Sequence, residues 1–336
     1  MSSSQQPKQA KMPSLTLAAT DENDADLHFY SKFDETHGKE SRKEWYNQAT
    51  AAYIEARPRY PKKMMLSALK EARLWGDTDD EEEMLANQIL EIGCGPGTAT
   101  VELVKMGYNV TAIDPAPQNC IAARQQCQEV LGVDSDADAS DRVTVIEATF
   151  EDYQHDANSS TKPVYAVLCP TSFHWISPEV ACTKTAAILR PTLGCLLLWW
   201  AMPPMPSTEI CEQLQDIYDD LDESKLGQDM QRYCGKEFSQ RSLARVYQGV
   251  NDSGLYEQND KPLELQPQSF RYTPQKLITL LSTLSPYIAL EEQKRLVLFD
   301  TLLLRLQGIC KDQDQAELEL TGYFGFQCFW VKPGDE

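Results

Sequence analysis

The chain has 336 residues, 42% of them apolar, which is ample material for a buried core. Its formal net charge of −20 creates a field that repels phosphate backbones and anionic lipids, which argues against nucleic acids and membrane surfaces as partners. The longest apolar run, "CLLLWWAM", is too short to span a bilayer. We therefore expect a soluble globular protein that binds a small molecule.

The ten cysteines are scattered singly, without a CxxC pair, and several lie in apolar strand-like runs. This pattern is typical of buried, reduced thiols and predicts a cytoplasmic protein. Residues 1–27 are polar and are expected to form a disordered tail, whereas residues 28–336 are expected to form one domain. No metal site is predicted, because the acidic stretch 134–141 has Ala139 where a calcium loop requires glycine.

The middle of the chain alternates between strand-like and helix-like segments. The predicted strands are 88–93, 108–114, 142–148, 164–169 and 194–201, and the predicted helices are 98–106, 118–131 and 179–190. In the second helix, the helical period places Ile121, Arg124, Cys127 and Leu131 in register. Repeated strand–helix–strand units predict a parallel sheet.

The alternation stops after Pro203. Residues 207–260 are polar and mostly helical in pattern, and 263–272 are strand-like. Two amphipathic helices, 273–285 and 290–309, then precede a final strand at 322–332. The C-terminal part of the chain is therefore expected to add a mainly helical region to the sheet.

The stretch "EIGCGPGTAT" places Gly93, Gly95 and Gly97 directly after the first strand. Such a turn lets a ligand approach the backbone and the N–H groups of the following helix. The third glycine comes one residue earlier than in the GxGxxG dinucleotide motif, where Thr98 stands instead. Asp114, at the end of the second strand, is placed to accept hydrogen bonds from both ribose hydroxyls. Together these features favour one adenosine ligand without a pyrophosphate.

Three stretches, "ILEIGCGPGTAT", "VTAID" and "LRPTLGCLLLW", resemble the class I S-adenosylmethionine-dependent methyltransferases in order and spacing. Three more, "YIEARPRYP", "TSFHWI" and "YTPQKLITLLSTLSPYIAL", resemble the small-molecule branch that includes trans-aconitate methyltransferase-like proteins. The resemblance implies an α/β fold with a Rossmann-like seven-stranded methyltransferase sheet, an antiparallel last strand and a helical lid insertion. It also implies S-adenosylmethionine as cofactor and O-methylation of a carboxylate or hydroxyl on a small molecule.

The same resemblance divides the domain into four parts. They are a cover segment (45–62), a donor-binding core (86–202), a lid and substrate-selecting region (203–310) and the final strand (320–332). The sequence leaves the oligomeric state open.

The resemblance implies a set of donor contacts. It places Glu91 and the three glycines around the methionine part of the donor, and Asp114 on the ribose. Where the family often has an acidic residue for the adenine amino group, this sequence has Thr149, followed by Phe150 and Glu151. Adenine is therefore expected to contact a backbone N–H and an apolar wall, and a role for Glu151 as ligand stays open.

The cover segment contributes Tyr53, Arg57 and Tyr60. The aromatic rings of the two tyrosines are expected near the sulfonium or the substrate. Arg57 either pairs with a carboxylate of the donor or substrate, or is a surface residue. Arg59 follows Arg57 closely, and Arg271 is expected at the start of a lid helix. The three arginines suggest that positive charges converge on an anionic acceptor. Alternatively, each arginine neutralises a nearby acidic residue.

His174 is the tentative catalytic residue. A hydroxyl acceptor needs a general base, which an imidazole can supply, whereas a carboxylate acceptor needs none, and the same position could simply hold a packed histidine. Phe173 and Trp175 are expected to form pocket wall. The adjacent Trp199 and Trp200 must point to opposite faces of their strand, so at most one lines the site.

Two other functions stay open at this point. One is a catalytically silent S-adenosylmethionine-binding protein that keeps the donor pocket. The other, which the early third glycine disfavours, is a nicotinamide-dependent oxidoreductase on a related sheet.

Overall fold

The structure is a computed structural model. It describes residues 29–74, 88–155, 164–233 and 243–333, apart from 177, 192, 244–245, 258, 260 and 262–263. The tail predicted for residues 1–27 lies outside the described residues.

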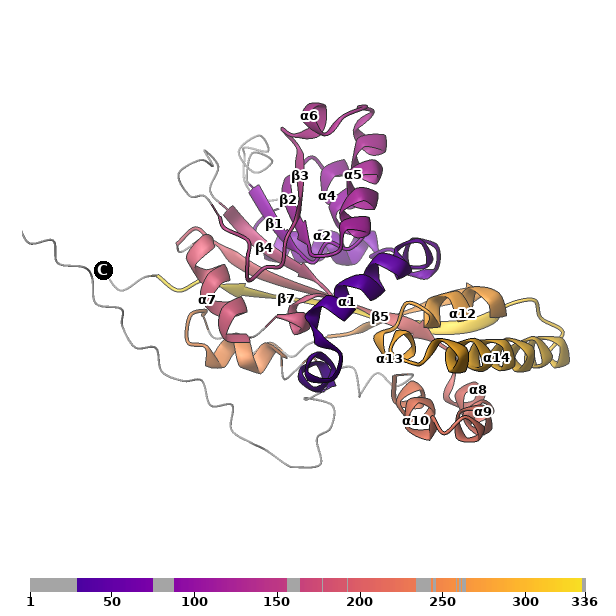
Figure 1. Cartoon of the computed structure of the whole chain (residues 1–336). Coiled ribbons are helices and arrows are strands. Elements are labelled where there is room, and N and C mark those ends of the chain that lie inside the picture. The colour runs from indigo at the N-terminus through magenta and orange to yellow at the C-terminus, as the bar shows by residue number, and fades with distance from the viewer. Residues whose placement is uncertain are drawn as a thin grey trace, which may run out of the picture.

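One mixed sheet forms the centre of the molecule, with strand order β3-β2-β1-β4-β5-β7-β6 (Figure 1). Its strands are β1 (Gln88–Ile92), β2 (Asn109–Asp114), β3 (Val143–Glu147), β4 (Val164–Pro170), β5 (Cys195–Met205), β6 (Gln266–Tyr272) and β7 (Leu318–Trp330). Strands β1 to β5 pair in parallel, and β7 runs antiparallel to both β5 and β6. The predicted seven-stranded α/β sheet with an antiparallel last strand is confirmed.

Helices cover both faces of the sheet, so its central strands are buried on both sides, as parallel strands usually are. One face packs against α2 (Lys62–Glu71), α4 (Thr100–Lys105) and α5 (Pro117–Leu131), and the other against α7 (Pro178–Ile188). Trp199 belongs to the first of these apolar clusters and Trp200 to the second. The prediction that the two indoles point to opposite faces is confirmed.

The buried face of α5 includes Cys127 of the predicted register but not Ile121. Cys120, Ala123 and Cys127 are buried there, whereas Ile121 is 42% exposed. The apolar pattern of this helix is weak, because alanine, cysteine and glutamine recur on several of its sides. The small side chains of the buried face let the helix lie close to the glycine turn that follows β1.

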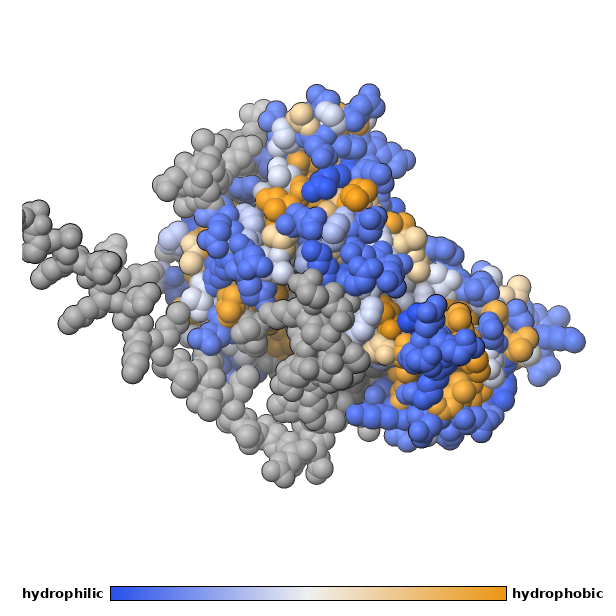
Figure 2. Space-filling view, viewed as in Figure 1, coloured by the Kyte–Doolittle hydropathy of each residue, from blue (hydrophilic) through white to orange (hydrophobic). Residues whose placement is uncertain are grey.

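The C-terminal half forms a helical lobe around the far ends of β5 and β7, which are 11 and 13 residues long (Figure 1). Its helices are α8 (Thr208–Glu212), α9 (Gln215–Asp220), α10 (Ser224–Tyr233), α12 (Pro274–Leu281), α13 (Ser285–Ile288) and α14 (Glu292–Asp312). These helices bury a third apolar cluster together with Met205, Tyr272 and Leu320 of the sheet. Figure 2 shows a mostly hydrophilic surface, with hydrophobic residues visible on the lobe.

Nine of the ten cysteines lie in the described part of the chain, and all nine are buried, as predicted for thiols in apolar strands and helices. Within that part, no helix has the length and apolar character needed to cross a membrane.

Helix α14 offers a matched pair for testing how the lobe is held together. Leu302 is fully buried in the third cluster, whereas Leu304, on the same helix, is 70% exposed. We expect Leu302→Ala to lower the free energy of unfolding by about 2–5 kcal/mol, because it leaves a cavity, and Leu304→Ala to change it by less than about 0.5 kcal/mol. Urea unfolding measures both values, and equal effects would contradict the described packing of α14.

Candidate functional site

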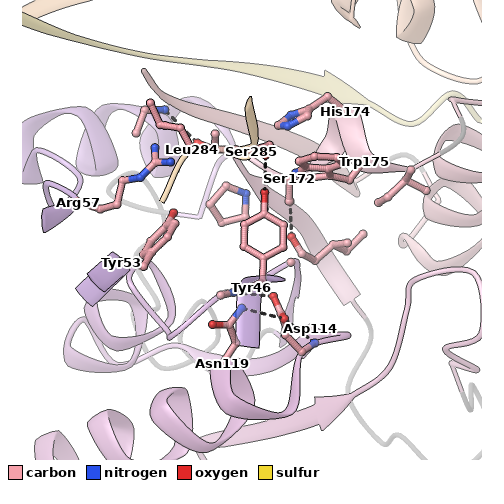
Figure 3. A pocket seen from close by; sticks show the side chains of 18 of the residues that line it. Tyr46, Tyr53, Arg57, Asp114, Asn119, Ser172, His174, Trp175, Leu284 and Ser285 are labelled. Carbon is pink, nitrogen blue, oxygen red and sulfur yellow. Dashed lines mark hydrogen bonds between the residues drawn. The ribbon is translucent and has the colours of Figure 1, made fainter. Parts of the chain in front are cut away.

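A cavity of about 350 Å³ opens at the carboxyl ends of the parallel strands (Figure 3). It lies where the strand order reverses between β1 and β4, the usual ligand position in open α/β sheets. Its walls come from three parts of the chain: the loops after β1 to β5, the cover helix α1 (Phe29–Ala56), and the helical lobe.

The turn after β1 depends on glycine for two physical reasons. Gly93, Gly95 and Gly97 have φ angles of +68°, +56° and +92°, where other residues are strained. A Cβ on Gly93 would lie 2.5 Å from Ser172 Cβ, and one on Gly97 would lie 3.0 Å from Ala123 Cα. Gly93 and Gly95 line the cavity, and a Cβ on Gly95 would meet open space. Gly97 is outside the cavity wall and permits the close approach of α5.

Asp114 ends β2 in the wall of the cavity and is only 6% exposed. Its Oδ2 accepts a hydrogen bond of 2.9 Å from the Gly95 N–H. Its Oδ1 accepts bonds of 2.9 Å from the Ala116 N–H and 3.1 Å from Asn119 Nδ2. Burial raises the pKa of the Asp114 carboxyl, and these three hydrogen bonds oppose that rise. The carboxyl group therefore joins the glycine turn to the start of α5.

Glu91 is placed differently from the prediction. Its side chain is fully buried beneath the turn and does not line the cavity, because along β1 it points to the opposite face from Leu90 and Ile92. Neither carboxyl oxygen has a hydrogen-bond partner among the described residues. Burial raises the pKa of Glu91 to about 8; nearby Thr100 lowers it and Asp114 raises it further. At neutral pH this carboxyl is therefore largely protonated.

Thr149, Phe150 and Glu151 follow β3 and line the cavity, as the sequence predicts. The Thr149 hydroxyl accepts a 3.1 Å bond from the Asp152 N–H and caps this turn. Lys184 Nζ donates to the carbonyl oxygens of Phe150 and Glu151 at 2.6 and 3.0 Å. These bonds hold the backbone of the wall in place, with the Phe150 ring forming an apolar surface.

Tyr53, near the end of α1, and Arg57, directly after it, reach the cavity, also as predicted (Figure 3). The guanidinium carbon of Arg57 lies 5.1 Å from the centre of the Tyr53 ring. Arg57 Nε donates to Thr283 Oγ1 at 2.9 Å, and its Nη2 donates to the Thr283 carbonyl at 3.2 Å. Within the described residues Arg57 forms no ion pair, so its charge is held at the cavity by neutral partners.

Arg57 is the single member of the predicted arginine group that reaches the cavity. Arg59 is 62% exposed and forms an ion pair with Glu102 at 3.1 Å. Arg271 is exposed on the edge strand β6, in register with Glu319 of β7. It does not open a helix, because α12 begins only at Pro274. The predicted convergence of cations from the two ends of the sequence is therefore wrong.

His174 and Trp175 line the cavity from the short 3₁₀ turn Phe173–Trp175 after β4 (Figure 3). The His174 ring stacks on Trp200, with centres 5.2 Å apart and planes at 27°. Trp175 meets the Tyr46 ring edge-on, with ring centres 6.0 Å apart. The imidazole is thus held between aromatic groups at the cavity.

Tyr60 and Phe173, two residues expected at the substrate, lie in the core instead. The Tyr60 hydroxyl shares a 3.1 Å hydrogen bond with that of Thr171, and its ring packs 5.6 Å from the ring of Trp199. Phe173 is 3% exposed in the apolar cluster under the α7 face of the sheet. Both assignments are therefore corrected. Tyr60 packs against Thr171 and Trp199. The 3₁₀ turn directs His174 and Trp175 to the cavity and Phe173 to the core.

Several cavity residues were not predicted from the sequence. Tyr46 precedes Tyr53 by seven residues, which is two turns of α1, so helical spacing could have identified it. Asn119 lies in the first turn of α5, and its contact with Asp114 depends on the direction in which this helix leaves β2. The lobe contributes Leu226, Asp229, Met230, Leu284, Ser285 and Tyr287. No local motif marks these positions, because only the packing of the lobe brings them to the cavity.

Metal-binding residues do not gather in the described ranges, where no group of three or more His, Cys, Asp or Glu side chains could hold an ion.

Comparison with known proteins agrees with the fold. Residues 89–192 match the family model described as a methyltransferase domain. An uncharacterized methyltransferase of Mycobacterium tuberculosis is 29% identical over 154 residues, which cover 46% of this chain and 51% of the relative. The chain thus aligns with about half the length of this relative.

A second relative, the ubiquinone biosynthesis O-methyltransferase of Methylocella silvestris, is 42% identical over 62 residues, 18% of this chain and 22% of that protein. One similar solved structure is an S-adenosylmethionine-dependent methyltransferase of Geobacter sulfurreducens in complex with S-adenosylhomocysteine. It is 15% identical, has a TM-score of 0.41, and aligns with 84% of this chain and 97% of its own. The strand order and the glycine turn described above agree with the match of residues 89–192 to a methyltransferase domain.

The buried Glu91 carboxyl predicts a specific pH dependence of stability. Its pKa is about 8 in the folded chain against 4.5 for a solvent-exposed glutamate, so the folded state holds more protons between these values. Folding stability is therefore lost as pH rises from about 5 to 8. We expect Glu91→Gln to remove this loss and to be more stable than the wild type by on the order of 4 kcal/mol at pH 8. Thermal unfolding of both proteins from pH 5 to 8 measures the difference, and parallel curves would contradict it.

Proposed function

We propose that this chain transfers the methyl group of S-adenosylmethionine to an oxygen atom, carboxylate or hydroxyl, of a small molecule. The observation that carries the proposal is a single cavity shared by the glycine turn with Asp114 on one side and by the helical lobe on the other. A volume of about 350 Å³ suits small ligands, and the net charge of −20 disfavours nucleic acid.

The residues on the donor side fit S-adenosylmethionine. Of the two Asp114 oxygens, Oδ1 accepts two hydrogen bonds and Oδ2 only one, so Oδ2 has a lone pair left and would accept from the ribose hydroxyls. The open space at Gly95 lets a ligand approach the backbone. Phe150 and the neighbouring backbone would hold the adenine. When bound, the donor supplies an electrophilic methyl group on a positively charged sulfur.

The acceptor side is mainly apolar, with a few polar groups. Met205, Leu226 and Tyr287 line it, and Arg57 and His174 are the polar groups best placed to orient an acceptor. The protein would act chiefly by aligning the acceptor oxygen and excluding water. A carboxylate acceptor would pair with Arg57, whereas a hydroxyl acceptor would give its proton to His174. The motif resemblance to trans-aconitate methyltransferase-like proteins supports a small-molecule acceptor.

Donor binding is tested at Asp114. Replacing Asp114 with Ala removes the acceptor of two ribose hydrogen bonds and should weaken binding of S-adenosylhomocysteine by about tenfold to a hundredfold, roughly 1.5–3 kcal/mol. Asp134→Ala is the matched control, because it makes the same charge change at an exposed residue. Calorimetry with both variants decides the point, and unchanged affinity in Asp114→Ala would refute the donor site.

The acceptor class is tested at Arg57 and His174, using an acceptor found by screening metabolites with tritiated donor. If the acceptor oxygen belongs to a carboxylate, transfer should persist in His174→Gln and fail in Arg57→Met, with Arg59→Met as control. The donor affinity of Arg57→Met must stay unchanged, since otherwise Arg57 holds the donor. Loss of transfer in His174→Gln, with a wild-type rate rising through pH 6 to 7, would instead indicate a hydroxyl. Donor binding without transfer to any tested acceptor would favour a silent binding protein.

A further inference from the structure

A chain of hydrogen bonds connects the cover helix α1 to the ribose-side carboxylate. Thr50 Oγ1 lies 2.9 Å from Asn119 Oδ1, and Asn119 Nδ2 donates to Asp114 Oδ1 at 3.1 Å. The three side chains are 8%, 5% and 6% exposed, respectively, so water does not compete strongly for these bonds. Asp114 in turn accepts the N–H of Gly95. The chain therefore runs from α1 to the glycine turn.

The chemistry of the groups sets the direction of the bonds. An ionised Asp114 can only accept, so the NH₂ group of Asn119 must face it and the Asn119 carbonyl must face Thr50. The Thr50 hydroxyl has one proton and two acceptors, Asn119 Oδ1 and the Tyr46 carbonyl, both at 2.9 Å. The bond to Asn119 joins α1 to α5, whereas the bond to the Tyr46 carbonyl stays within α1.

Helix α1 contacts both the core that carries Asp114 and the helical lobe. Towards the core, Asn47 Oδ1 accepts the Gln118 N–H at 3.1 Å, beside the Thr50–Asn119 bond. Towards the lobe, the Tyr46 hydroxyl bonds Ser285 at 3.2 Å, as Figure 3 shows. The position of α1 thus depends on contacts with the core and the lobe, and the Thr50 bond is the one that reaches the ribose-side carboxylate.

We infer that Asn119 and Thr50 are positioning residues that couple docking of α1 to donor binding through Asp114. Asn119 holds the Asp114 carboxylate in one orientation only while its own carbonyl is bonded to Thr50. A ligand that engages Asp114 favours the same orientation and hence the docked α1. Because such coupling is reciprocal, a docked α1 raises donor affinity and a bound donor holds α1. This inference rests on the proposed donor site and extends it to two residues outside the donor motifs.

The test uses the full chain, S-adenosylhomocysteine as probe, and two variants of one position. Thr50→Val removes the hydroxyl and keeps the shape, whereas Thr50→Ser keeps the hydroxyl. We expect Thr50→Val to bind the probe about three- to tenfold more weakly than the wild type, and Thr50→Ser to restore most of the affinity. In hydrogen exchange, the probe should protect the amides of residues 46–56 in the wild type and Thr50→Ser, and less in Thr50→Val.

A second variant gives a readout that a purely structural role would not produce. In Asn119→Asp, two carboxyl groups face each other and share one proton at low pH, which preserves the bond to Asp114. Its affinity for the probe should approach the wild-type value near pH 6 and fall progressively below it towards pH 9. Among the described residues, Glu91, Cys94 and Cys120 also interact electrostatically with Asp114. They are unchanged in the variant, so the wild type over the same pH range is the reference.

The outcomes separate the two proposals. If the wild type does not bind S-adenosylhomocysteine, the proposed function fails, and the coupling fails with it. If the wild type binds, but Thr50→Val equals Thr50→Ser in affinity and protection, the coupling is overturned while the donor site stands. An Asn119→Asp affinity that follows the wild type at every pH would also overturn it.

Discussion

The buried carboxylate of Asp114 is the interaction on which the cavity depends. It binds the N–H groups of Gly95 and Ala116 and the amide of Asn119, and so fixes the turn after β1 against the start of α5. A buried carboxylate is costly unless such donors surround it, so the surrounding backbone must adopt this one geometry. Gly95, whose N–H the carboxylate binds, has a φ angle of +56°, which glycine adopts without strain.

The sheet supplies one part of the site and the added helices supply the other. Parallel strands bring the loops after β1, β2 and β4 to one edge of the sheet. The glycine turn, Asp114 and His174 therefore lie around the same cavity. Helix α1 and the lobe then close that space with residues from distant parts of the chain. Leu226, Met230 and Tyr287 belong both to the cavity wall and to the third apolar cluster, so the packing of the lobe positions the residues that it contributes to the cavity.

Charge has a particular role in a chain this acidic. Arg57 reaches the cavity and is bonded to Thr283 rather than to an acid, although acidic residues outnumber basic ones 51 to 31. Arg59, two residues later, has the ordinary exposed ion pair with Glu102. This contrast makes Arg57 the natural partner for an anionic group of a ligand.

Features encoded by neighbouring residues were predictable from the sequence. The strand–turn–helix units, the glycine turn, the place of Asp114 and the opposite orientations of Trp199 and Trp200 all follow from backbone periods and short spacings. These features need no knowledge of distant contacts, because each depends on the conformation of a few consecutive residues. The family resemblance pointed to Thr149, Phe150, Glu151, Tyr53 and Arg57, and these residues lie in the cavity wall.

Tertiary packing alone decided the rest. Glu91 faces away from the cavity, Tyr60 and Phe173 are buried, and Arg271 lies exposed on an edge strand. For each of them, the residue type was compatible with a site, but the neighbouring element determined which face met the cavity. Tyr46, Asn119 and the lobe residues enter the site through contacts made across long sequence separations. A sequence pattern specifies the period of a helix or strand, whereas the side that faces a ligand is set by what packs against the other side.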